Sequence, residues 1–320
     1  MTSCQGDFVF CVFWQVIQSL PHPLLELPLS LLSRLLLCDP ERSVSRLGKS
    51  ACVFFTPPRD IQLSAGPTPL SRTASSLLSD LLQLDTLWDS AVELLTLLSL
   101  VARCSRCPAH IQLHLEASAL HQALTHPCDQ IRAAACRLIG NVDPFRPPTL
   151  KPDIFKSMIN CLYDPCMPVR RMACRAVGNW LGYIAAGAGF KESNRKGSDT
   201  SGRGREKEHK LQLGKGDLGT IAEQGVEDEE RCRWMEGAGR AAAMLAPLIN
   251  DRDALTRRHC CAALGNLVKD DSAVSSLSKK DMCSLLLRAA CMDSHKAVRQ
   301  AAIATLCLYS EQESVRQVNK

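Results

Sequence analysis

Residues 161–179 read CLYDPCMPVRRMACRAVGN, and three other stretches share their layout without gaps. These stretches are ALTHPCDQIRAAACRLIGN at 123–141, LINDRDALTRRHCCAALGN at 248–266 and ACMDSHKAVRQAAIATLCL at 290–308. Each has Asp or His in its fourth place and an Arg six residues later, and the first three end in Gly-Asn. Four matches at the same offsets indicate an internal repeat.

Each copy is expected to form two helices joined at the Asp-Pro or His-Pro turn, because proline restricts the residue before it and cannot continue a helix interior. Pro168 suits the opening turn of the second helix of its repeat. Apolar residues then recur at the spacing of one buried helical stripe, at Val169, Ala173, Ala176, Val177 and Trp180. The pattern predicts stacked helix pairs.

The repeat period supports a solenoid. Arg132 and Arg170 are 38 residues apart, and Arg257 and Arg299 are 42 apart, which is in the range of HEAT and armadillo repeats. The 5% aromatic content argues against a sheet-rich domain, and the abundance of Leu and Ala favours helices. The sequence therefore predicts an all-α armadillo/HEAT-type helical-repeat solenoid with a disordered insertion.

The composition changes along the chain and divides it into four parts. Repeats are expected over 70–190 and 238–320, separated by an insertion at 191–237 that is rich in charge and glycine and is predicted to be disordered. Residues 1–69 are expected to form irregular helices and a Pro-rich loop, and 25–55 resembles a degraded repeat. We interpret the helical parts as one continuous stack.

The cysteines and the charge balance limit the class of protein. The chain has 17 Cys, and most lie in apolar helical stretches where a free thiol packs as a small hydrophobic side chain. A reducing compartment is therefore expected. The net charge of +5 is mild for 320 residues, so a protein that coats a polyanion is not indicated. Nucleic-acid contact through the basic stretch 191–215 is an alternative function.

The repeated charged residues are the first candidate site. The Arg of each copy is expected to bridge the turn to an acidic residue of the same or the next repeat, which gives these residues a structural role. The residues concerned are Arg132, Arg170, Arg257, Arg299, Asp164, Asp251 and Asp293.

No cofactor, metal or catalytic site is predicted. The kinase catalytic-loop sequence His-Arg-Asp occurs nowhere, and Asp7-Phe8 is followed by Val9 where a kinase has Gly. Cys104, Cys107, His110 and His114 have zinc-ligand chemistry, but the pairs are too close together for a zinc finger. A non-catalytic interaction protein is the favoured function.

The chain resembles the C-terminal armadillo/HEAT region of the Fused-type serine/threonine kinases of Hedgehog signalling. The resemblance is carried by Thr73–Leu82, Asp89–Leu98 and the repeats at 123–179 and 248–266. It implies a regulatory scaffold, without a kinase domain in this chain, that acts in Hedgehog signalling and cilium assembly. The implied partners are the family's kinase domain, a kinesin-like protein, and Gli-type transcription factors with their suppressor. A cytoplasmic location is implied, with the cilium or nucleus as alternatives.

The Asn that ends three repeats is the second candidate site. In armadillo proteins such as importins and catenins, an Asn at this point faces a groove and bonds the backbone of an extended peptide. By that resemblance Asn141, Asn179 and Asn266 are candidate peptide-groove residues, and an importin-like adaptor is an alternative function. The competing interpretation is that Gly-Asn caps the helix or that the Asn forms a hydrogen bond within its own repeat.

Overall fold

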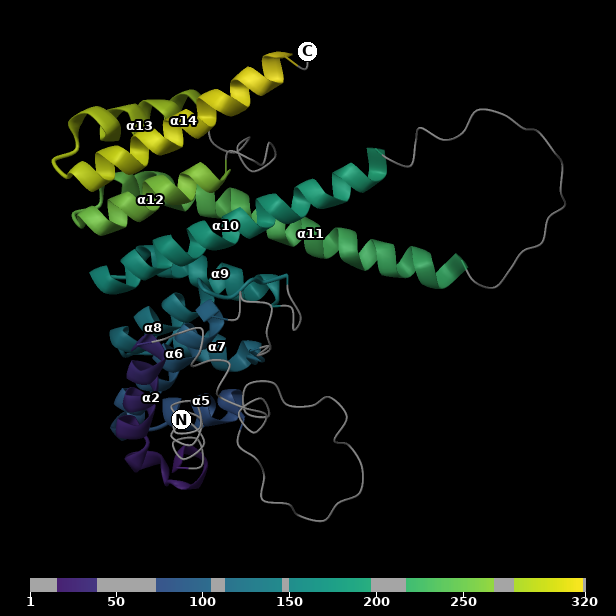
Figure 1. The fold of residues 1–320 in the computed structure, drawn as a ribbon. Helices are drawn as coiled ribbons and strands as arrows, with labels where there is room; N and C mark the ends of the chain where they lie inside the picture. Colours follow the sequence, from purple (N-terminus) through teal and green to yellow (C-terminus); the bar gives the residue numbers. More distant parts are fainter. Residues whose placement is uncertain are drawn as a thin grey trace, which may run out of the picture. The chain divides into compact units, whose positions relative to one another are not determined.

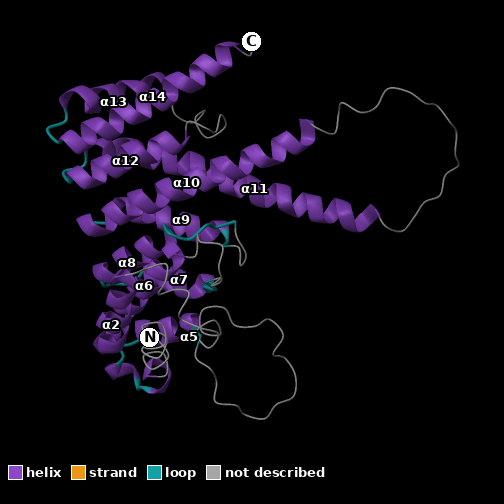
Figure 2. Cartoon of the chain, in the orientation of Figure 1, coloured by secondary structure: helices purple, strands orange, loops and turns teal. Residues whose placement is uncertain are grey.

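The computed structural model describes residues 16–38, 73–104, 113–145, 150–196, 217–267 and 279–318. Within these ranges the regular structure is helical and contains no strand (Figure 2), which confirms the all-α prediction. None of the helices in the described part of the chain is long and apolar enough to cross a membrane. The chain divides into two compact units, Met1–Asn179 and Trp180–Lys320, and each is described by itself.

The first unit is a succession of packed helices (Figure 1). Helix α6 packs against α2, α5 and α8, while α7 packs against α5, α8 and α9. Its core is built from the Leu, Ile and Ala side chains of these helices. The bounds are α2 Glu26–Cys38, α5 Ala74–Leu82, α6 Trp88–Cys104, α7 Ala117–Leu124, α8 Asp129–Ile139, α9 Pro152–Asn160 and the start of α10, Met167–Lys196.

Local sequence sets several of these helix starts. Thr73 caps α5, because its side chain accepts a hydrogen bond from the Ser76 backbone N–H and the Ser76 side chain accepts one from the Thr73 backbone N–H. Proline occupies the first turn of α9 at Pro152, where its missing N–H costs nothing. Asp129 opens α8, where a negative charge favours the helix dipole.

Among the described residues, the second unit contains the remainder of α10 and five further helical segments. Helix α14 packs against both α12 and α13, and η4 contacts α11, α12 and α13. Trp180 of α10 lies against Trp234 of α11, with ring centroids 5.6 Å apart. The bounds are α11 Asp217–Leu245, η4 Ala246–Asn250, α12 Ala254–Asn266, α13 Lys279–Met292 and α14 Lys296–Val318.

The predicted insertion at 191–237 differs from the structure at both ends. Helix α10 continues to Lys196, and α11 begins at Asp217, so only 197–216 lie outside the described residues. Glu, Ala and Arg, which are good helix formers, are frequent in α11. Farther along α11, Trp234 and Ala238 supply a buried side.

The predicted N-terminal part is only partly described. Helix α2 covers the beginning of the stretch 25–55, and its Leu29, Leu32 and Leu36 are fully buried. Residues 39–72, which include the rest of that stretch and the Pro-rich loop, lie outside the described residues.

Candidate functional site

The repeated Arg closes the turn of its own repeat. In all four copies Nη1 donates hydrogen bonds to the carbonyl oxygens of the fourth and fifth repeat residues. The distances are 2.7 and 2.7 Å for Arg132, 2.9 and 3.0 Å for Arg170, 2.9 and 3.2 Å for Arg257, and 2.7 and 3.1 Å for Arg299. The six-residue spacing thus brings the guanidinium back over the turn.

The other edge of the guanidinium joins one repeat to the next. In the first unit, Arg132 Nε lies 2.7 Å from Asp164 Oδ2 and Nη2 lies 3.0 Å from Asp164 Oδ1. In the second unit, Arg257 makes the same contacts with Asp293, at 2.7 and 2.9 Å. These side chains are only 8–14% exposed. A two-pronged, partly buried pair of this kind fixes register as well as adding energy.

The aspartate also organises the turn that it belongs to. Oδ1 accepts a hydrogen bond from the backbone N–H two residues later, at 2.9 Å from Asp164, 2.8 Å from Asp251 and 2.8 Å from Asp293. Hydrogen bonds from Arg257 are the main cause that lowers the pKa of Asp293, and Asp293 in turn raises the pKa of Arg257. The charged forms are therefore favoured in the folded unit.

In the first repeat, His126 takes the place of the aspartate and accepts the hydrogen bond that organises the turn. Its Nδ1 accepts from the Cys128 N–H at 3.1 Å, which assigns the proton to Nε2, 3.3 Å from the Leu82 carbonyl oxygen. The ring is 6% exposed and meets Trp88 edge-on, with centroids 4.9 Å apart. The His-for-Asp exchange visible in the sequence thus keeps the turn and ties the repeat to the helices before it.

The repeated Gly lets the second helices of neighbouring repeats approach closely. A Cβ placed on Gly140 would lie 2.8 Å from the Cα of Ala176. On Gly265 it would lie 3.0 Å from Thr305 Oγ1. Both neighbours occupy the same place, six residues after the Arg of the next repeat.

The expected peptide-facing amides are used inside the units. Asn141 is 8% exposed, and its Nδ2 donates to Ser99 Oγ at 2.9 Å and to the Ser99 carbonyl oxygen at 3.3 Å. Asn179 Nδ2 donates to the Gly140 carbonyl oxygen at 2.7 Å. The peptide-groove assignment stays a prediction at both positions, where Nδ2 is engaged by a hydrogen bond inside the unit.

Asn266 lies in the same kind of setting. Its amide is next to Gly182, where an added Cβ would lie 3.5 Å from Nδ2, and the residue is half-buried. Periodicity puts these three Asn residues at the same place in their repeats, but it contains no information on how deeply a side chain is buried.

The thiol four residues after the Arg is a packing residue in three repeats. Cys136, Cys174 and Cys261 are fully buried and unoxidised. Burial raises the pKa of Cys261 to about 11, and a hydrogen bond with Cys161 is the main cause that raises the pKa of Cys136. Thiols held protonated in this way are poor nucleophiles and metal ligands.

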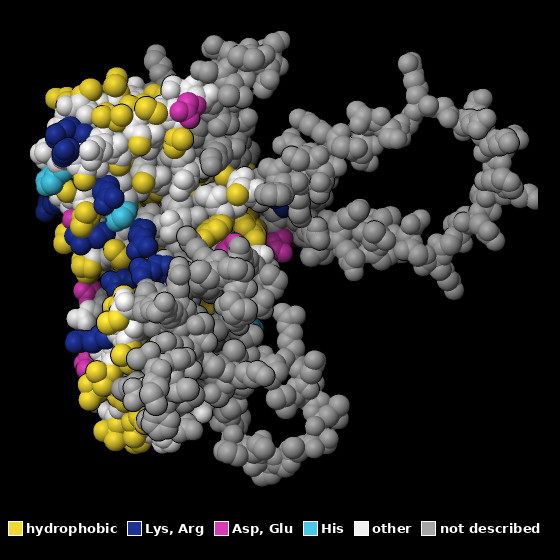
Figure 3. All heavy atoms as spheres, in the orientation of Figure 1, with side chains coloured by type: hydrophobic (Ala, Val, Ile, Leu, Met, Phe, Trp, Pro, Cys, Tyr) yellow, Lys and Arg dark blue, Asp and Glu magenta, His cyan; other side chains and the backbone are white. Residues whose placement is uncertain are grey.

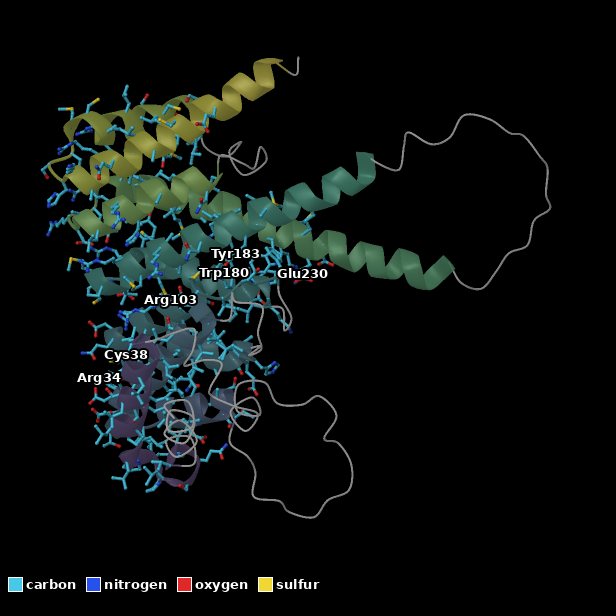
Figure 4. The ribbon with its side chains drawn as sticks, viewed as in Figure 1. Arg34, Cys38, Arg103, Trp180, Tyr183 and Glu230 are labelled. Atoms are coloured by element: carbon cyan, nitrogen blue, oxygen red, sulfur yellow. The ribbon has the colours of Figure 1, made fainter. Side chains whose placement is uncertain are left out.

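No metal-binding group of His, Cys, Asp and Glu occurs among the described residues. Cys107 and His110 of the tightly spaced Cys/His stretch lie outside them. Figure 4 labels Trp180 and Tyr183 on α10 near Glu230 of α11. Trp180 is fully buried, so it contributes to the core of the second unit and is not available to a partner.

Exposed apolar residues gather next to the turns. Tyr163 and Met167 flank the Asp164 turn and are 53% and 42% exposed. In the second unit Leu255 is 39% exposed and Met292, which precedes Asp293, is 76% exposed. Figure 3 shows Lys, Arg and His side chains among hydrophobic ones on the side of the α13–α14 turn. We call these exposed residues the turn edge of their unit, which is Tyr163 and Met167 in the first unit and Leu255 and Met292 in the second.

Comparison with known proteins identifies the fold and no family. No family model and no curated protein matches the chain. A designed armadillo repeat protein matches with a TM-score of 0.52 and 14% identity, over 93% of this chain and 98% of the other.

A second designed armadillo repeat protein, in complex with the peptide (KR)4, has a TM-score of 0.53, 14% identity and the same coverage. The crystal structure of an engineered protein matches with a TM-score of 0.53 and 13% identity, over 94% and 96%. The chain thus has an armadillo-type helical-repeat fold, as the repeat pattern predicts.

Proposed function

We propose that this protein is a non-catalytic scaffold that binds partner proteins through its turn edge. The observation that carries the proposal is that the recurrent residues and the exposed residues of the repeats have different roles. Their recurrent Arg, Asp, Gly and Asn residues are used to join helices, while Tyr163, Met167, Leu255 and Met292 remain exposed beside the turns. Aromatic and Met side chains are enriched in protein interfaces.

The more specific proposal is a regulatory region of a Fused-type kinase, acting in Hedgehog signalling and cilium assembly in the cytoplasm or cilium. Its support is the sequence resemblance, whose two upstream segments, Thr73–Leu82 and Asp89–Leu98, coincide with the packed helices α5 and α6. The proposed partners are the kinase domain of that family, a kinesin-like protein, and Gli-type transcription factors with their suppressor.

The experiment is a binding titration between the purified chain and the purified kinase domain of a Fused-type kinase. We expect saturable binding that the pair Tyr163→Glu/Met167→Glu weakens about tenfold or more, as for truncated interface anchors. Leu27→Glu is the matched control, because Leu27 is 67% exposed and lies within helix α2 of the same unit. Absence of binding sinks the kinase assignment, and equal losses in both variants sink the turn edge.

Two alternatives have less support. An importin-like adaptor is suggested by the designed neighbour solved with (KR)4, but here the amides of Asn141 and Asn179 are bonded internally. Nucleic-acid contact rests on the basic stretch 191–215, most of which lies outside the described residues. It predicts binding that falls steeply with salt and disappears when this stretch is deleted.

A further inference from the structure

The Arg–Asp pair of the second unit, Arg257–Asp293, is not repeated at Arg299, the next Arg of the series. Arg299 closes its own turn through Nη1, at 2.7 Å from the Asp293 carbonyl oxygen and 3.1 Å from that of Ser294. Among the described residues, its Nε and Nη2 have no acceptor. In Arg132 and Arg257 this same edge is filled by an aspartate carboxylate. The geometry thus leaves a half-buried cation with its carboxylate-binding edge available.

The apolar surface beside Arg299 is exposed at repeat positions that are buried in other copies. Four places of the repeat are buried in the first and third copies. Two of them lie two and six residues before the turn residue, and the other two lie four and eight residues after the Arg. The buried residues are Leu120, Leu124, Cys136 and Gly140, and Leu245, Ile249, Cys261 and Gly265.

In the fourth copy all four places are exposed. Leu287 is 57% and Ile303 50% exposed, and Cys291 and Cys307 are exposed as well. We call these four residues and Arg299 the end face, which is formed by α13 and α14 (Figure 1). Because the fold covers the corresponding places elsewhere with a helix pair, the end face has the shape and polarity of a surface built to be covered.

We propose that the end face binds a helical hairpin of another protein whose turn presents an aspartate. The internal pairs define the chemistry that Arg299 would recognise. The carboxylate takes both Nε and Nη2 of the arginine, and it is held in place by the backbone N–H two residues later, as His295 N holds Asp293 at 2.8 Å. Carboxylates and Arg form such two-pronged bonds with strong geometric preference.

Cys307 makes the end face different from the internal joints between repeats. Gly140 and Gly265 have no side chain at this place, and an added Cβ would come within 2.8–3.0 Å of the following helix. Cys307 has a full side chain there, so an incoming helix has to lie farther out or carry a small residue. A looser contact of this kind suits a partner that binds and leaves.

A second copy of this chain fits the end face less well. Asp293, the turn aspartate of the fourth repeat, already holds Arg257 and is only 8% exposed. A symmetric contact would bring Arg299 to a surface that lacks a free aspartate at the turn. The proposal is also independent of the turn edge, since the two surfaces share no residue.

The test is site-specific photo-cross-linking of the full chain in cells, with p-benzoylphenylalanine replacing Ile303. The control position is Leu84, which is 56% exposed in the other unit. We expect an Ile303-specific adduct whose cross-linked segment, located by mass spectrometry, is a helix that follows an aspartate-bearing turn. Arg299→Gln and, separately, Leu287→Glu should each reduce the adduct about tenfold, as should Asp→Asn in the partner's turn.

Leu287→Glu keeps the experiment decisive if Arg299→Gln disturbs the turn, because the exposed Leu287 side chain takes no part in it. Circular dichroism and thermal melting check that each variant is folded. An adduct with a second copy alone, no adduct, or an adduct insensitive to both variants overturns the proposal. The pair Tyr163→Glu/Met167→Glu should leave the Ile303 adduct unchanged, which separates failure here from failure of the turn edge.

Discussion

The first and second units solve the same stacking problem with different side chains. Both use an Arg–Asp pair, in which the arginine Nε lies 2.7 Å from the aspartate Oδ2. The pairs are Arg132–Asp164 and Arg257–Asp293. They differ where the second helices meet. The first unit places Ala176 against Gly140 and adds the Asn179 hydrogen bond, whereas the second places Thr305 and Leu308 against Gly265. The charged pair is thus the constant part of the joint, and the helix contact adapts to local size.

The largest expected effect is at the closer contact. Gly140→Ala puts a methyl group 2.8 Å from the backbone of Ala176, which cannot turn away, so we expect a loss of about 3 kcal/mol in the unfolding free energy of the first unit. Gly265→Ala meets the Thr305 side chain at 3.0 Å, which can shift, and should cost about 1 kcal/mol. Urea unfolding followed by hydrogen exchange in α8 and α12 measures both. Equal losses would show that the two joints are equally tight.

The charged pair comes next, and here the two units should behave alike. Asp164→Asn and Asp293→Asn each leave a partly buried guanidinium without its counter-charge, and we expect a loss of about 2 kcal/mol from either. A loss in one unit alone would show that the pair is not the constant part of the joint.

The Asp293 pair also has a defined pH dependence. Because the pKa of Asp293 is lowered in the folded unit, its stabilisation is complete above the ordinary aspartate pKa, about 3.9, and disappears as the pH falls through the lowered pKa. The stability difference between parent and Asp293→Asn should therefore shrink as the pH falls below about 4. Denaturant titrations at several pH values measure this difference.

The sequence predicted the helical repeat because the repeat depends on local rules. Fixed offsets between turn residue, Arg and Gly require no knowledge of the neighbours, and the turn geometry of Arg132 and Asp164 follows the pattern. The destination of Asn141 was not predictable in this way. Its partner Ser99 lies in α6, outside the four matching copies, so no repeat spacing points to it.

The repeat pattern could not predict the end face, for a related reason. The fourth copy departs from the others at Ile303, Cys307 and Leu308, which looks like sequence drift when the letters alone are compared. Only burial shows that Leu308 packs on Gly265 in the place of an Asn, while Ile303 and Cys307 are exposed. The structural effect of a residue change within a repeat depends on which residues pack against it.

Single hydrogen bonds between second helices should have smaller effects of similar size in the two units. Asn179→Ala removes the 2.7 Å bond to the Gly140 carbonyl oxygen, and Thr305→Val removes the 2.8 Å bond to the Cys261 carbonyl oxygen. We expect each substitution to lower the free energy of unfolding by about 1 kcal/mol. Thr305→Val should have the larger effect, because Thr305 is 2% exposed and water cannot replace the lost hydrogen bond. Thr305→Ser is the matched control, since it keeps the hydroxyl.

The smallest effect is chemical and does not alter stability. Cys261 and Cys307 lie at neighbouring places of successive repeats, but burial raises the pKa of Cys261 to about 11 while Cys307 is exposed. At pH 8 an alkylating reagent should therefore modify Cys307 within minutes and leave Cys261 unmodified until the second unit unfolds, because only the thiolate reacts and only where the reagent can reach it. Peptide mass spectrometry over a time course reads both sites in one sample, and urea supplies the control in which the two rates converge. Equal rates in the native protein would show that α14 opens readily from α12, and would remove the distinction between a covered and an open repeat surface on which the end face rests.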